Sequence, residues 1–477
     1  MKVAFITSEV VPFSKTGGLA DVVGALPAAL ERLGVDVKVI SPLYSCVRRH
    51  PLEQLPNLVT VPLGGGRNAW GAVRKSGRFH FLEHDSFYGR SGLYGNGTGD
   101  YGDNPARFVF LMRGALEYLS QLGKPPDIIH VHDWQTALVP LYLKTMYCDR
   151  FPNTRSVLTI HNLAYQGRFW KGELPTTGFG WHRFTYRDLE HYDDVNFLKG
   201  GLIHADALTT VSPTYAHEIQ RSEYGYGLDG VIRTRAGNLR GILNGVDVGE
   251  WNAETDPYLP ACFSAASLEG KARCKASLQQ RYGLPQRPEV PLFCLVGRLA
   301  EQKGVDLFLR AADGILRDDL QIVILGSGED QLQRGVDHLA SRYRGKVSVY
   351  IGFDNGLAHQ ILAGSDALLV PSRYEPCGLT QLYALRYGTV PVVRSTGGLV
   401  DTVEPGVTGV RFDHYTVDGL QWAVREILGL YRDTARWTRM QQAGMARDFS
   451  WDASAREYLS LYSSLVPPSG GAAVGDA

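Results

Sequence analysis

A lysine and two adjacent glycines lie close to the start of the chain, in the stretch Lys15-Thr16-Gly17-Gly18, between a predicted strand and a predicted helix. Glycines at such a bend let the backbone turn tightly and bring its N–H groups against a ligand, and the N-terminus of the following helix favours an anion. The stretch therefore fits a phosphate site, although a Gly-Gly turn is more often a plain connection between elements. A Walker A sequence is absent, and "GSGED" at 326–330 is only a fragment of a dinucleotide-binding fingerprint.

Two further cations, Arg298 and Lys303, follow a predicted strand in "VGRLAEQKGVDLFL" and flank a loop that ends at Gly304. Two positive charges at the end of a strand can hold a diphosphate and stabilise the charge that develops as it departs. The alternative for this stretch is a solvated loop whose cations form surface ion pairs.

A carboxylate, Glu375, lies in "SRYEPCGLTQLYAL", just before a helix that we expect to start near Gly378. A carboxylate at a strand end, beside the N–H groups of a helix, suits the binding of sugar hydroxyls next to a phosphate. A glutamate that only caps the helix is the alternative. The three stretches together indicate a site for a phosphorylated sugar.

Motifs with the spacing of metal ligands are sparse in this sequence. No Asp-x-Asp occurs, and the six cysteines are scattered without a Cys-x-x-Cys pair, so we expect neither a structural zinc site nor a disulfide framework. The pair His130-x-His132 could ligate a metal from one face of a strand, but buried or hydrogen-bonded histidines are the expectation. We therefore predict no metal and no cofactor.

The elements that carry these stretches alternate between strands and helices. Apolar residues predict a strand at 2–8, a helix at 19–33 and a strand in "DVKVISP", which together make a βαβ unit. Pro27 falls inside the helical pattern and is expected to kink it. "DIIHVHDW" and "RSVLTIHN" are typical of buried strands that end in polar residues, and open α/β sheets bind ligands beyond these carboxyl ends.

A second series of strands begins near Pro291 with "PLFCLVGRL" and continues through "LQIVILGSG", "VSVYIGF", "DALLVPSRYEPCG" and "TVPVVRSTGG". The predicted fold class is α/β, with two Rossmann-like domains that are each a doubly wound parallel sheet. A turn-rich stretch after Asn244 sets the boundary, giving domains at 1–243 and 244–450. We expect a helix at 451–465 that returns to the first domain, and a disordered tail at 466–477.

Composition limits the classes of partner. The chain has 477 residues, of which 44% are hydrophobic and 21% charged, and its 49 basic and 49 acidic residues give zero net charge. This balance is typical of globular proteins and provides no field that would recruit nucleic acid or an anionic membrane, so we predict neither as a partner. No signal peptide and no apolar run of about 18 residues is found. A cytoplasmic location is expected.

The motifs together resemble those of one family. The stretches are Lys15 to Leu19, "HDW" at 132–134, "HN" at 161–162, "LNGVD" at 243–247, "GRLAEQKG", and "EPCGLTQLYAL" followed by "TGGLVDTV". They are similar to the motifs of bacterial glycogen synthases and plant starch synthases, over residues 1 to about 465. The resemblance implies a GT-B glycosyltransferase whose two domains face each other across a deep cleft. It also implies transfer of glucose from ADP-glucose to the non-reducing 4-hydroxyl of an α-1,4-glucan, with retention and without a metal.

The resemblance also implies roles for individual residues. The residues implied as catalytic are Lys15, Asp133, His161, Arg298, Lys303 and Glu375. Those implied to bind the nucleotide sugar are Lys15, Gly17, Gly18, Arg298, Lys303, Cys377, Gly378, Leu379 and Thr380. Those implied to contact the sugar or the acceptor are Glu9, Tyr94, Arg107, Asn162 and Asn244. The first domain would then be the glucan side and the second the nucleotide-sugar side.

The sequence motifs leave some alternative functions open. Many retaining GT-B enzymes carry a second glutamate eight positions after the first, whereas Tyr383 stands there, which favours the glycogen and starch synthases over sucrose-synthase-like enzymes. The phosphate motifs do not encode the base, so a related transferase that uses UDP-glucose or a small acceptor fits them too. A non-catalytic glucan-binding scaffold is a further alternative. If the chain is a processed plant enzyme, the plastid stroma replaces the cytoplasm.

Overall fold

The computed structural model describes residues 1–64, 66–97 and 99–466, and these fall into two compact units. The first unit comprises Met1–Val211, Ala216–Gly245 and the residues from Trp451 onward. The second comprises Ser212–Tyr215 and Val246–Ser450. The first unit is therefore built from segments that the whole second unit separates in the sequence.

A buried strand, β1 (Lys2–Ile6), lies at the centre of the first unit's sheet, where its apolar side chains are covered on both faces. Among the described residues this sheet has nine strands in the order β12-β11-β7-β6-β1-β2-β5-β4-β3. Neighbours from β12 to β5 pair in parallel, whereas β4 pairs antiparallel with both β5 and β3. The bounds are β2 (Asp36–Pro42), β3 (Glu53–Leu63), β4 (Arg67–Ser76), β5 (Phe79–Glu83), β6 (Ile128–His132), β7 (Arg155–Ile160), β11 (Ala207–Thr210) and β12 (Leu239–Gly241).

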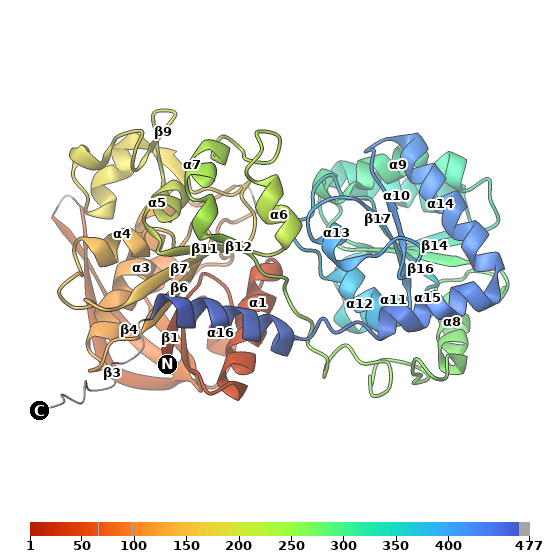
Figure 1. Ribbon diagram of the computed structural model, residues 1–477, viewed down its shortest axis with the longest axis horizontal. Coiled ribbons are helices and arrows are strands. Elements are labelled where there is room, and N and C mark those ends of the chain that lie inside the picture. The colour runs from red at the N-terminus through yellow and green to blue at the C-terminus, as the bar shows by residue number, and fades with distance from the viewer. Residues whose placement is uncertain (65, 98, 467–477) are drawn as a thin grey trace, which may run out of the picture. The chain divides into compact units, whose positions relative to one another are not determined.

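Helices and a small second sheet complete the first unit (Figure 1). The helices are α1 (Gly18–Arg32), α2 (Asp85–Tyr88), α3 (Asn104–Ser120), α4 (Val139–Lys144), α5 (Phe197–His204), α7 (Asp229–Thr234) and α16 (Trp451–Leu465). Helix α6 (Pro213–Glu218) begins in residues assigned to the second unit and ends in residues of the first. Short 3-10 turns are η1 (Val47–Arg49), η2 (Lys171–Thr177), η3 (Trp181–Arg183) and η4 (Ala236–Asn238). The small sheet pairs β8 (Arg168–Trp170), β10 (Asp194–Asn196) and β9 (Glu190–His191) antiparallel.

The first βαβ unit matches the prediction in kind but differs in detail. The strand ends at Ile6 instead of residue 8, and α1 runs unbroken from Gly18 to Arg32 with Pro27 inside it. Proline removes one helical hydrogen bond, and burial of Pro27 with its apolar neighbours on the same helix offsets that loss. The antiparallel strands β3 and β4 and the sheet of β8 to β10 were not predicted.

The C-terminal helix α16 packs against α1, 420 positions away in sequence, where Arg32 and Asp452 are paired. Figure 1 shows it in dark blue across the red and orange elements of the first unit. Its Tyr458 and Tyr462 are almost completely buried, and Ser454 Oγ donates to Leu243 O at 2.6 Å. The expected tail at 466–477 lies outside the described residues except for Val466.

The second unit has a fully parallel sheet among its described residues, in the order β15-β14-β13-β16-β17-β18. The strands are β13 (Leu292–Val296), β14 (Gln321–Gly326), β15 (Val347–Ile351), β16 (Ala367–Val370), β17 (Val390–Arg394) and β18 (Val410–Phe412). The helices are α8 (Glu269–Arg281), α9 (Val305–Ile315), α10 (Asp330–Arg342), α11 (Asn355–Gly364), α12 (Thr380–Arg386), α13 (Gly398–Thr402), α14 (Val417–Arg432) and α15 (Thr434–Met445), with the turn η5 (Glu301–Lys303). Apolar clusters on both faces of the sheet give it the doubly wound form that the sequence predicted.

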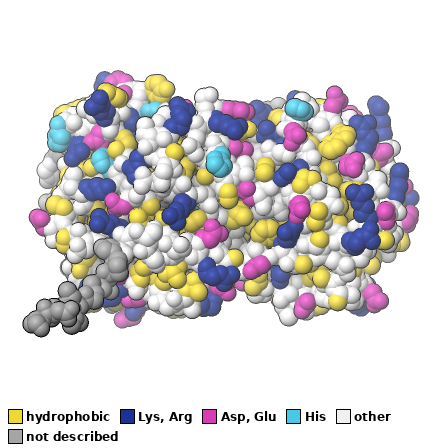
Figure 2. All heavy atoms as spheres, viewed as in Figure 1, with side chains coloured by type: hydrophobic (Ala, Val, Ile, Leu, Met, Phe, Trp, Pro, Cys, Tyr) yellow, Lys and Arg dark blue, Asp and Glu magenta, His cyan; other side chains and the backbone are white. Residues whose placement is uncertain are grey.

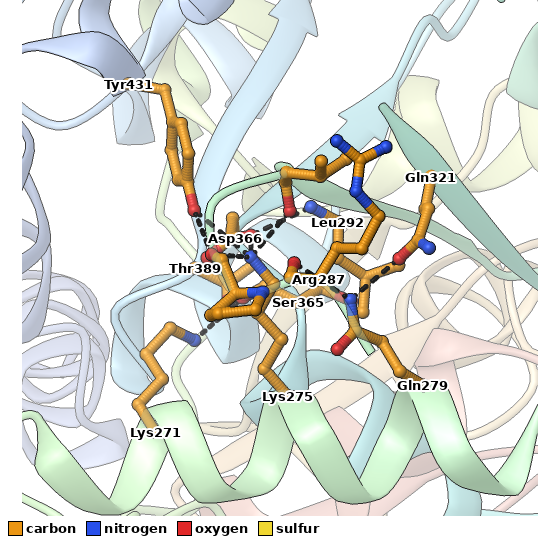
Figure 3. Close-up of polar contacts among 12 residues, drawn as sticks. Lys271, Lys275, Gln279, Arg287, Leu292, Gln321, Ser365, Asp366, Thr389 and Tyr431 are labelled. Carbon is orange, nitrogen blue, oxygen red and sulfur yellow. Dashed lines mark hydrogen bonds and ion pairs between the residues drawn. The ribbon is translucent and has the colours of Figure 1, made fainter. Parts of the chain in front are cut away.

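A buried polar network lies at the amino ends of the second unit's strands, away from the strand ends that bind ligands in such sheets. Lys271, Lys275 and Gln279 are four positions apart, so they point from one face of α8 (Figure 3). Lys275 Nζ lies 2.7 Å from Asp366 Oδ2, and the same carboxylate accepts the backbone N–H of Leu292 at 2.8 Å. The network therefore ties α8 to the starts of β13 and β16.

The visible surface mixes charges of both signs. Figure 2 shows Lys and Arg side chains interspersed with Asp and Glu, without a continuous area of one sign. Among the described residues, no helix combines the length and the apolar character that a membrane crossing requires. The cysteines of this part of the chain are all free thiols.

Candidate active site

The predicted Lys-Thr-Gly-Gly loop joins β1 to α1, and a buried carboxylate supports it from within. Glu9 accepts hydrogen bonds from Thr16 Oγ1 at 2.6 Å, from Gly17 N at 3.3 Å and from the backbone N–H of Thr16. The helix begins at Gly18 with Gly17 as its N-cap. Lys15 is exposed, and its Nζ lies 2.7 Å from Asp21 Oδ1 on the first turn of α1. Glu9 therefore fixes the bend that presents Lys15.

Tyr94 holds the Glu9 carboxylate in place, whereas Arg107, which was expected to contact the sugar or the acceptor, is buried. The Tyr94 hydroxyl donates to Glu9 Oε1 at 2.5 Å and lies 2.8 Å from Ser8 Oγ. Burial, with the nearby Glu9 charge, raises the pKa of Tyr94 well above its usual value. Arg107 is 0% exposed and its guanidinium donates to Phe87 O, Leu93 O and Asn104 Oδ1. We therefore correct its predicted role: Arg107 anchors the segment that carries Tyr94 and has no surface with which to touch a sugar.

Asp133 and His161 follow the neighbouring parallel strands β6 and β7, so their backbones lie side by side. Asp133 has a φ of 54°, a left-handed conformation that a non-glycine residue adopts only where the surroundings impose it. Its Oδ1 accepts the backbone N–H of His161 at 2.7 Å. Burial raises the pKa of Asp133 to about 7, against the lowering effect of the N–H groups of His161 and Asn162, and the Glu9 charge adds to the rise. Asp133 and His161 are thus joined by a hydrogen bond, and the charge of Glu9 acts on Asp133.

The His161 ring is held neutral by its surroundings. Burial lowers the pKa of His161 to about 3, so the ring carries no charge near neutral pH. Its Nε2 lies 3.1 Å from Nδ1 of His132. Asn162 follows directly, and its Oδ1 accepts the Ala164 N–H at 3.1 Å. Asn244 follows β12, and its buried Oδ1 has no hydrogen-bond partner among the described residues.

In the second unit, Lys303 and Glu375 form a close ion pair. They follow β13 and β16, which are neighbours in the sheet, and Lys303 Nζ lies 2.6 Å from Glu375 Oε2. The Glu375 side chain is 6% exposed and that of Lys303 27%. Ser372 Oγ donates to the same carboxylate oxygen at 3.1 Å. Sequence reasoning gave the lysine and the glutamate separate tasks, and the structure shows that they bond to each other.

Glycines allow the two loops of this pair to touch. Gly304 has a φ of 73°, and a Cβ there would lie 1.9 Å from Pro371 O. The N–H of Arg373 donates to Gln302 O at 2.9 Å, which joins the loops. A Cβ on Gly397 would lie 1.9 Å from Glu375 O, and the Gly398 N–H donates to that oxygen at 3.1 Å. Only glycine fits at these places, because backbone atoms cannot move aside.

The remaining predicted residues of the second unit lie around this pair. Arg298 is exposed and its Nη2 donates to Gln302 Oε1 at 3.0 Å. Cys377 is buried, Gly378 has a φ of 75°, and Leu379 precedes Thr380, the first residue of α12. These four residues lead directly from Glu375 into the helix.

Several supporting residues were missed from the sequence. Ser372, Gly397 and Gly398 hold Glu375, and His132 contacts His161. The "TGG" stretch was noticed as a family motif but received no role. Adjacent glycines next to a strand end were the available signal for the two glycines. For Ser372 the available signal was its position three residues before Glu375.

The paired histidines behave as expected of buried polar groups. His130 Nδ1 lies 2.7 Å from the Tyr462 hydroxyl and its Nε2 lies 2.6 Å from Thr159 Oγ1. The expectation of buried, hydrogen-bonded histidines is confirmed. Within the described ranges, no group of three or more His, Cys, Asp or Glu side chains is arranged to hold a metal ion.

Comparison with known proteins gives two family matches that follow one another along the chain. Residues 2–234 match the starch synthase catalytic domain, and residues 279–443 match the glycosyl transferases group 1. The glycogen synthase of Myxococcus xanthus is 51% identical over 98% of this chain and 100% of its own length. That of Geobacter sulfurreducens, glycogen synthase 1, is 46% identical over 97% of this chain and 96% of its own.

Solved structures agree with these matches. The catalytic domain of starch synthase IV from Arabidopsis thaliana, solved with ADP and acarbose, aligns with a TM-score of 0.90 at 36% identity, covering 97% of this chain and 99% of that chain. Sucrose-phosphate synthase from Thermosynechococcus elongatus aligns with a TM-score of 0.61 at 17% identity, covering 97% and 98% of the two chains, which shows a shared fold. The predicted fold class, with two Rossmann-like domains of the GT-B type, is confirmed.

Proposed function

The chain belongs to the family of bacterial glycogen synthases and plant starch synthases, and we propose that it transfers glucose from ADP-glucose to the non-reducing 4-hydroxyl of an α-1,4-glucan. The full-length similarity to glycogen synthases carries this proposal, because it covers both units and every motif singled out above. The ADP in the starch synthase IV structure supports the choice of donor. The chain is thus a glycosyltransferase that makes glycogen or a starch-like glucan.

The second unit would hold the leaving diphosphate. Lys303 has three N–H donors, and one of them is used by Glu375, so two remain for phosphate oxygens. Arg298 is exposed beside it and supplies a planar, permanently charged donor. Glu375, made rigid by Ser372 and Lys303, would accept hydrogen bonds from glucose hydroxyls. The backbone N–H groups around Gly378 to Thr380 would complete the phosphate contacts.

The first unit would contribute the remaining contacts to the donor and the acceptor. Lys15 and the backbone at Gly17 and Gly18 would approach the phosphate or the sugar. Asp133 and His161 would lie beneath the sugar and shield the cation that develops at its anomeric carbon. A neutral His161 suits this place, because an imidazolium would repel that positive charge. Glu9, Tyr94, Asn162 and Asn244 would shape the surroundings of the sugar.

Retention of configuration needs a mechanism, and no motif supplies an evident nucleophile for a double displacement. We infer a same-face substitution instead. The bond from the anomeric carbon to the phosphate oxygen breaks while the bond to the acceptor 4-oxygen forms, and the 4-hydroxyl proton moves to the departing phosphate. The cations stabilise the charge on that phosphate, and binding geometry contributes the rest. A glucosyl adduct on Asp133 or Glu375, trapped with donor alone, would contradict this mechanism.

Release of ADP from ADP-glucose, measured with and without glycogen primer, tests the function. We expect release that depends on primer, a lengthened glucan, and a much lower rate with UDP-glucose at equal concentration. Arg317→Ala, which removes an exposed charge elsewhere in the second unit, serves as the control variant and should retain full activity. Glucan binding without ADP release would favour a scaffold, and preference for UDP-glucose would correct the donor.

A further inference from the structure

His132 is the last residue of β6, directly before Asp133, and is fully buried. Its ring stacks on Phe5 of β1, with centroids 5.4 Å apart and planes 19° apart. The His130 ring lies against it at a tilt of 32°, with centroids 4.3 Å apart. The His130 ring is itself fixed, because both of its nitrogens have partners in Tyr462 and Thr159. The orientation of His132 is therefore fixed by groups that belong to the strands and to α16.

The hydrogen bond between His132 Nδ1 and His161 Nε2, at 3.1 Å, admits two proton arrangements. A neutral imidazole has one donor and one acceptor nitrogen, and burial lowers the pKa of both rings far enough to keep them neutral. In the first arrangement, His132 Nδ1–H donates to His161 Nε2. In the second, His161 Nε2–H donates to His132 Nδ1, and the proton of His132 is then on its own Nε2.

The surroundings of His132 Nε2 decide between the two. This nitrogen is buried and has no hydrogen-bond partner among the described residues. The second arrangement would leave an N–H donor buried without an acceptor, whereas the first leaves only an acceptor lone pair unused. Orphaned buried N–H groups are rarer than under-used acceptors, so the first arrangement has the lower free energy. His161 then accepts at Nε2 and carries its proton on Nδ1.

We propose that His132 is a positioning residue that holds His161 in the tautomer with its proton on Nδ1, so that His161 offers the donor sugar a neutral N–H. The inference rests on the proposed function, since it places His161 against the glucosyl group. A ring held in this way would donate to one sugar oxygen without adding charge. It would also need no reorientation when the substrate binds, which is how prearranged donors contribute to catalysis. Through His130, this arrangement depends on Tyr462 of the C-terminal helix.

Two substitutions separate the hydrogen bond from the ring packing. His132→Phe keeps the stacked ring but loses the donor, and we expect kcat/KM to fall about ten- to a hundredfold, the scale of a misplaced reacting group. His132→Asn places an amide N–H near the former Nδ1 and should recover most of that loss, although it loses the ring. A role in packing alone predicts the opposite order, with the phenylalanine variant the more active. Urea unfolding of both variants checks that they are folded under assay conditions.

Deoxy analogues of the donor give the sharper readout. ADP-glucose analogues that each lack one hydroxyl are assayed with the wild type and with His132→Phe. We expect the penalty of the substitution to vanish for the one analogue that lacks the oxygen facing His161, and to persist for the others. An equal penalty on every analogue would overturn the proposal.

Ring ¹⁵N spectra of histidine-labelled full-length protein test the tautomer without any turnover. We expect Nδ1 to be protonated and Nε2 unprotonated in both His132 and His161, assigned by comparison with His132→Phe. A proton on His161 Nε2 would overturn the inference even if the enzyme is active. A correct tautomer in a protein that does not use ADP-glucose would instead refute only the proposed function.

Discussion

Lys303 and Glu375 form a short, partly buried ion pair, so a substitution of one residue also changes the environment of the other. Removing the lysine takes a cation from the diphosphate and also leaves a buried carboxylate without its partner. Removing the carboxylate frees the lysine side chain, which would then lose the orientation that the pair provides. Each substitution therefore reports on both residues.

We expect Lys303→Ala and Glu375→Ala each to lower turnover with ADP-glucose about a hundredfold or more, the scale of a lost electrostatic contact in the transition state. The double variant should cost little beyond the worse single variant, because the two residues act as a unit. Steady-state ADP release measures all three, with Arg317→Ala as the matched loss of charge. Additive losses would mean that the two side chains contribute independently.

Asp133 gives a pH dependence with a definite sign. Its folded pKa of about 7 lies above the ordinary aspartate value of 3.8, so protonated Asp133 is the form that folding favours. The stability from this group is complete below about pH 4, and it is lost as pH rises toward 7. The difference of about three pKa units between the folded and the ordinary value corresponds to a loss of unfolding free energy of at most roughly 4 kcal/mol.

Urea unfolding between pH 4 and pH 8 tests this dependence. Asp133→Asn should flatten the decline in unfolding free energy over this range, because an amide keeps the acceptor for the His161 N–H and does not titrate. Asp149→Asn, at an exposed aspartate, is the control and should leave the profile of the wild type unchanged. Identical profiles for wild type and Asp133→Asn would contradict the raised pKa.

Residue types and spacing placed Lys303 and Glu375 after two apolar strands, and the structure brings the two side chains together because the carboxyl ends of neighbouring strands meet. Residue types and spacing were not enough for Arg107, whose guanidinium binds the carbonyl groups of Phe87 and Leu93, 20 and 14 positions earlier in the chain. His132 was expected to be buried, but its contact with His161, 29 positions away, was not predicted. A partner chosen by tertiary packing leaves no mark in local sequence.

At the scale of elements, the second sheet carries a buried ion pair at the amino ends of its strands, opposite to the ends that Lys303 and Glu375 follow. Lys275 and Asp366 side chains are 7% and 12% exposed, and Lys275 also donates to Pro288 O and Val290 O. Figure 3 shows Lys275 between Lys271 and Gln279 on α8, directed at Asp366. The pair connects a helix to two strand starts, so its effect should be on stability.

We expect Lys275→Met to lower the unfolding free energy of the second unit by about 3 kcal/mol or more, because Asp366 would stay buried without its cation. Differential scanning calorimetry measures the change. Activity per folded molecule should be unchanged below the transition. Arg287→Ala removes one partner of an exposed ion pair on the same unit and should shift the transition little. Equal shifts for both variants would show that burial does not distinguish the two pairs.

Elements with strong local patterns were predicted best. Short apolar runs bounded by turn residues gave β1, β2, β6 and β7 of the first sheet and β13 to β17 of the second, because such strands are buried on both faces. The shorter parallel strands β5, β11, β12 and β18 were not predicted. The antiparallel pair β3 and β4 was missed, since its exposed residues alternate with apolar ones and interrupt any continuous run. Pro27, which was expected to kink α1, lies inside a helix that continues to Arg32, because burial of the helix offsets the lost hydrogen bond.

At the scale of the whole molecule, the chain is too long for a single core, and the order of its segments matters. The first unit cannot be completed until the ribosome has made the second, because α16 follows residue 450. Four residues at 212–215 belong in turn to the second unit, where Thr214 Oγ1 donates to Asp401 Oδ1 at 2.7 Å. The sequence suggested the return of the last helix, but nothing in it indicated this short insertion.

The discontinuity predicts how fragments of the chain behave. Helix α16 buries Trp451, Ala455, Tyr458, Leu461 and Tyr462 within the first unit. Burial of each aromatic or leucine side chain stabilises the fold by roughly 1.5–3 kcal/mol. Loss of the helix therefore removes about as much free energy as the whole free energy of unfolding of a typical domain. A fragment of residues 1–245 should therefore lack cooperative unfolding and bind a hydrophobic dye. Adding a peptide of residues 446–466 should restore a cooperative transition, and the same peptide with Tyr458→Ser and Tyr462→Ser should not. Cooperative unfolding of the fragment alone, followed by tryptophan fluorescence in urea, would show that the first unit does not depend on the returning helix.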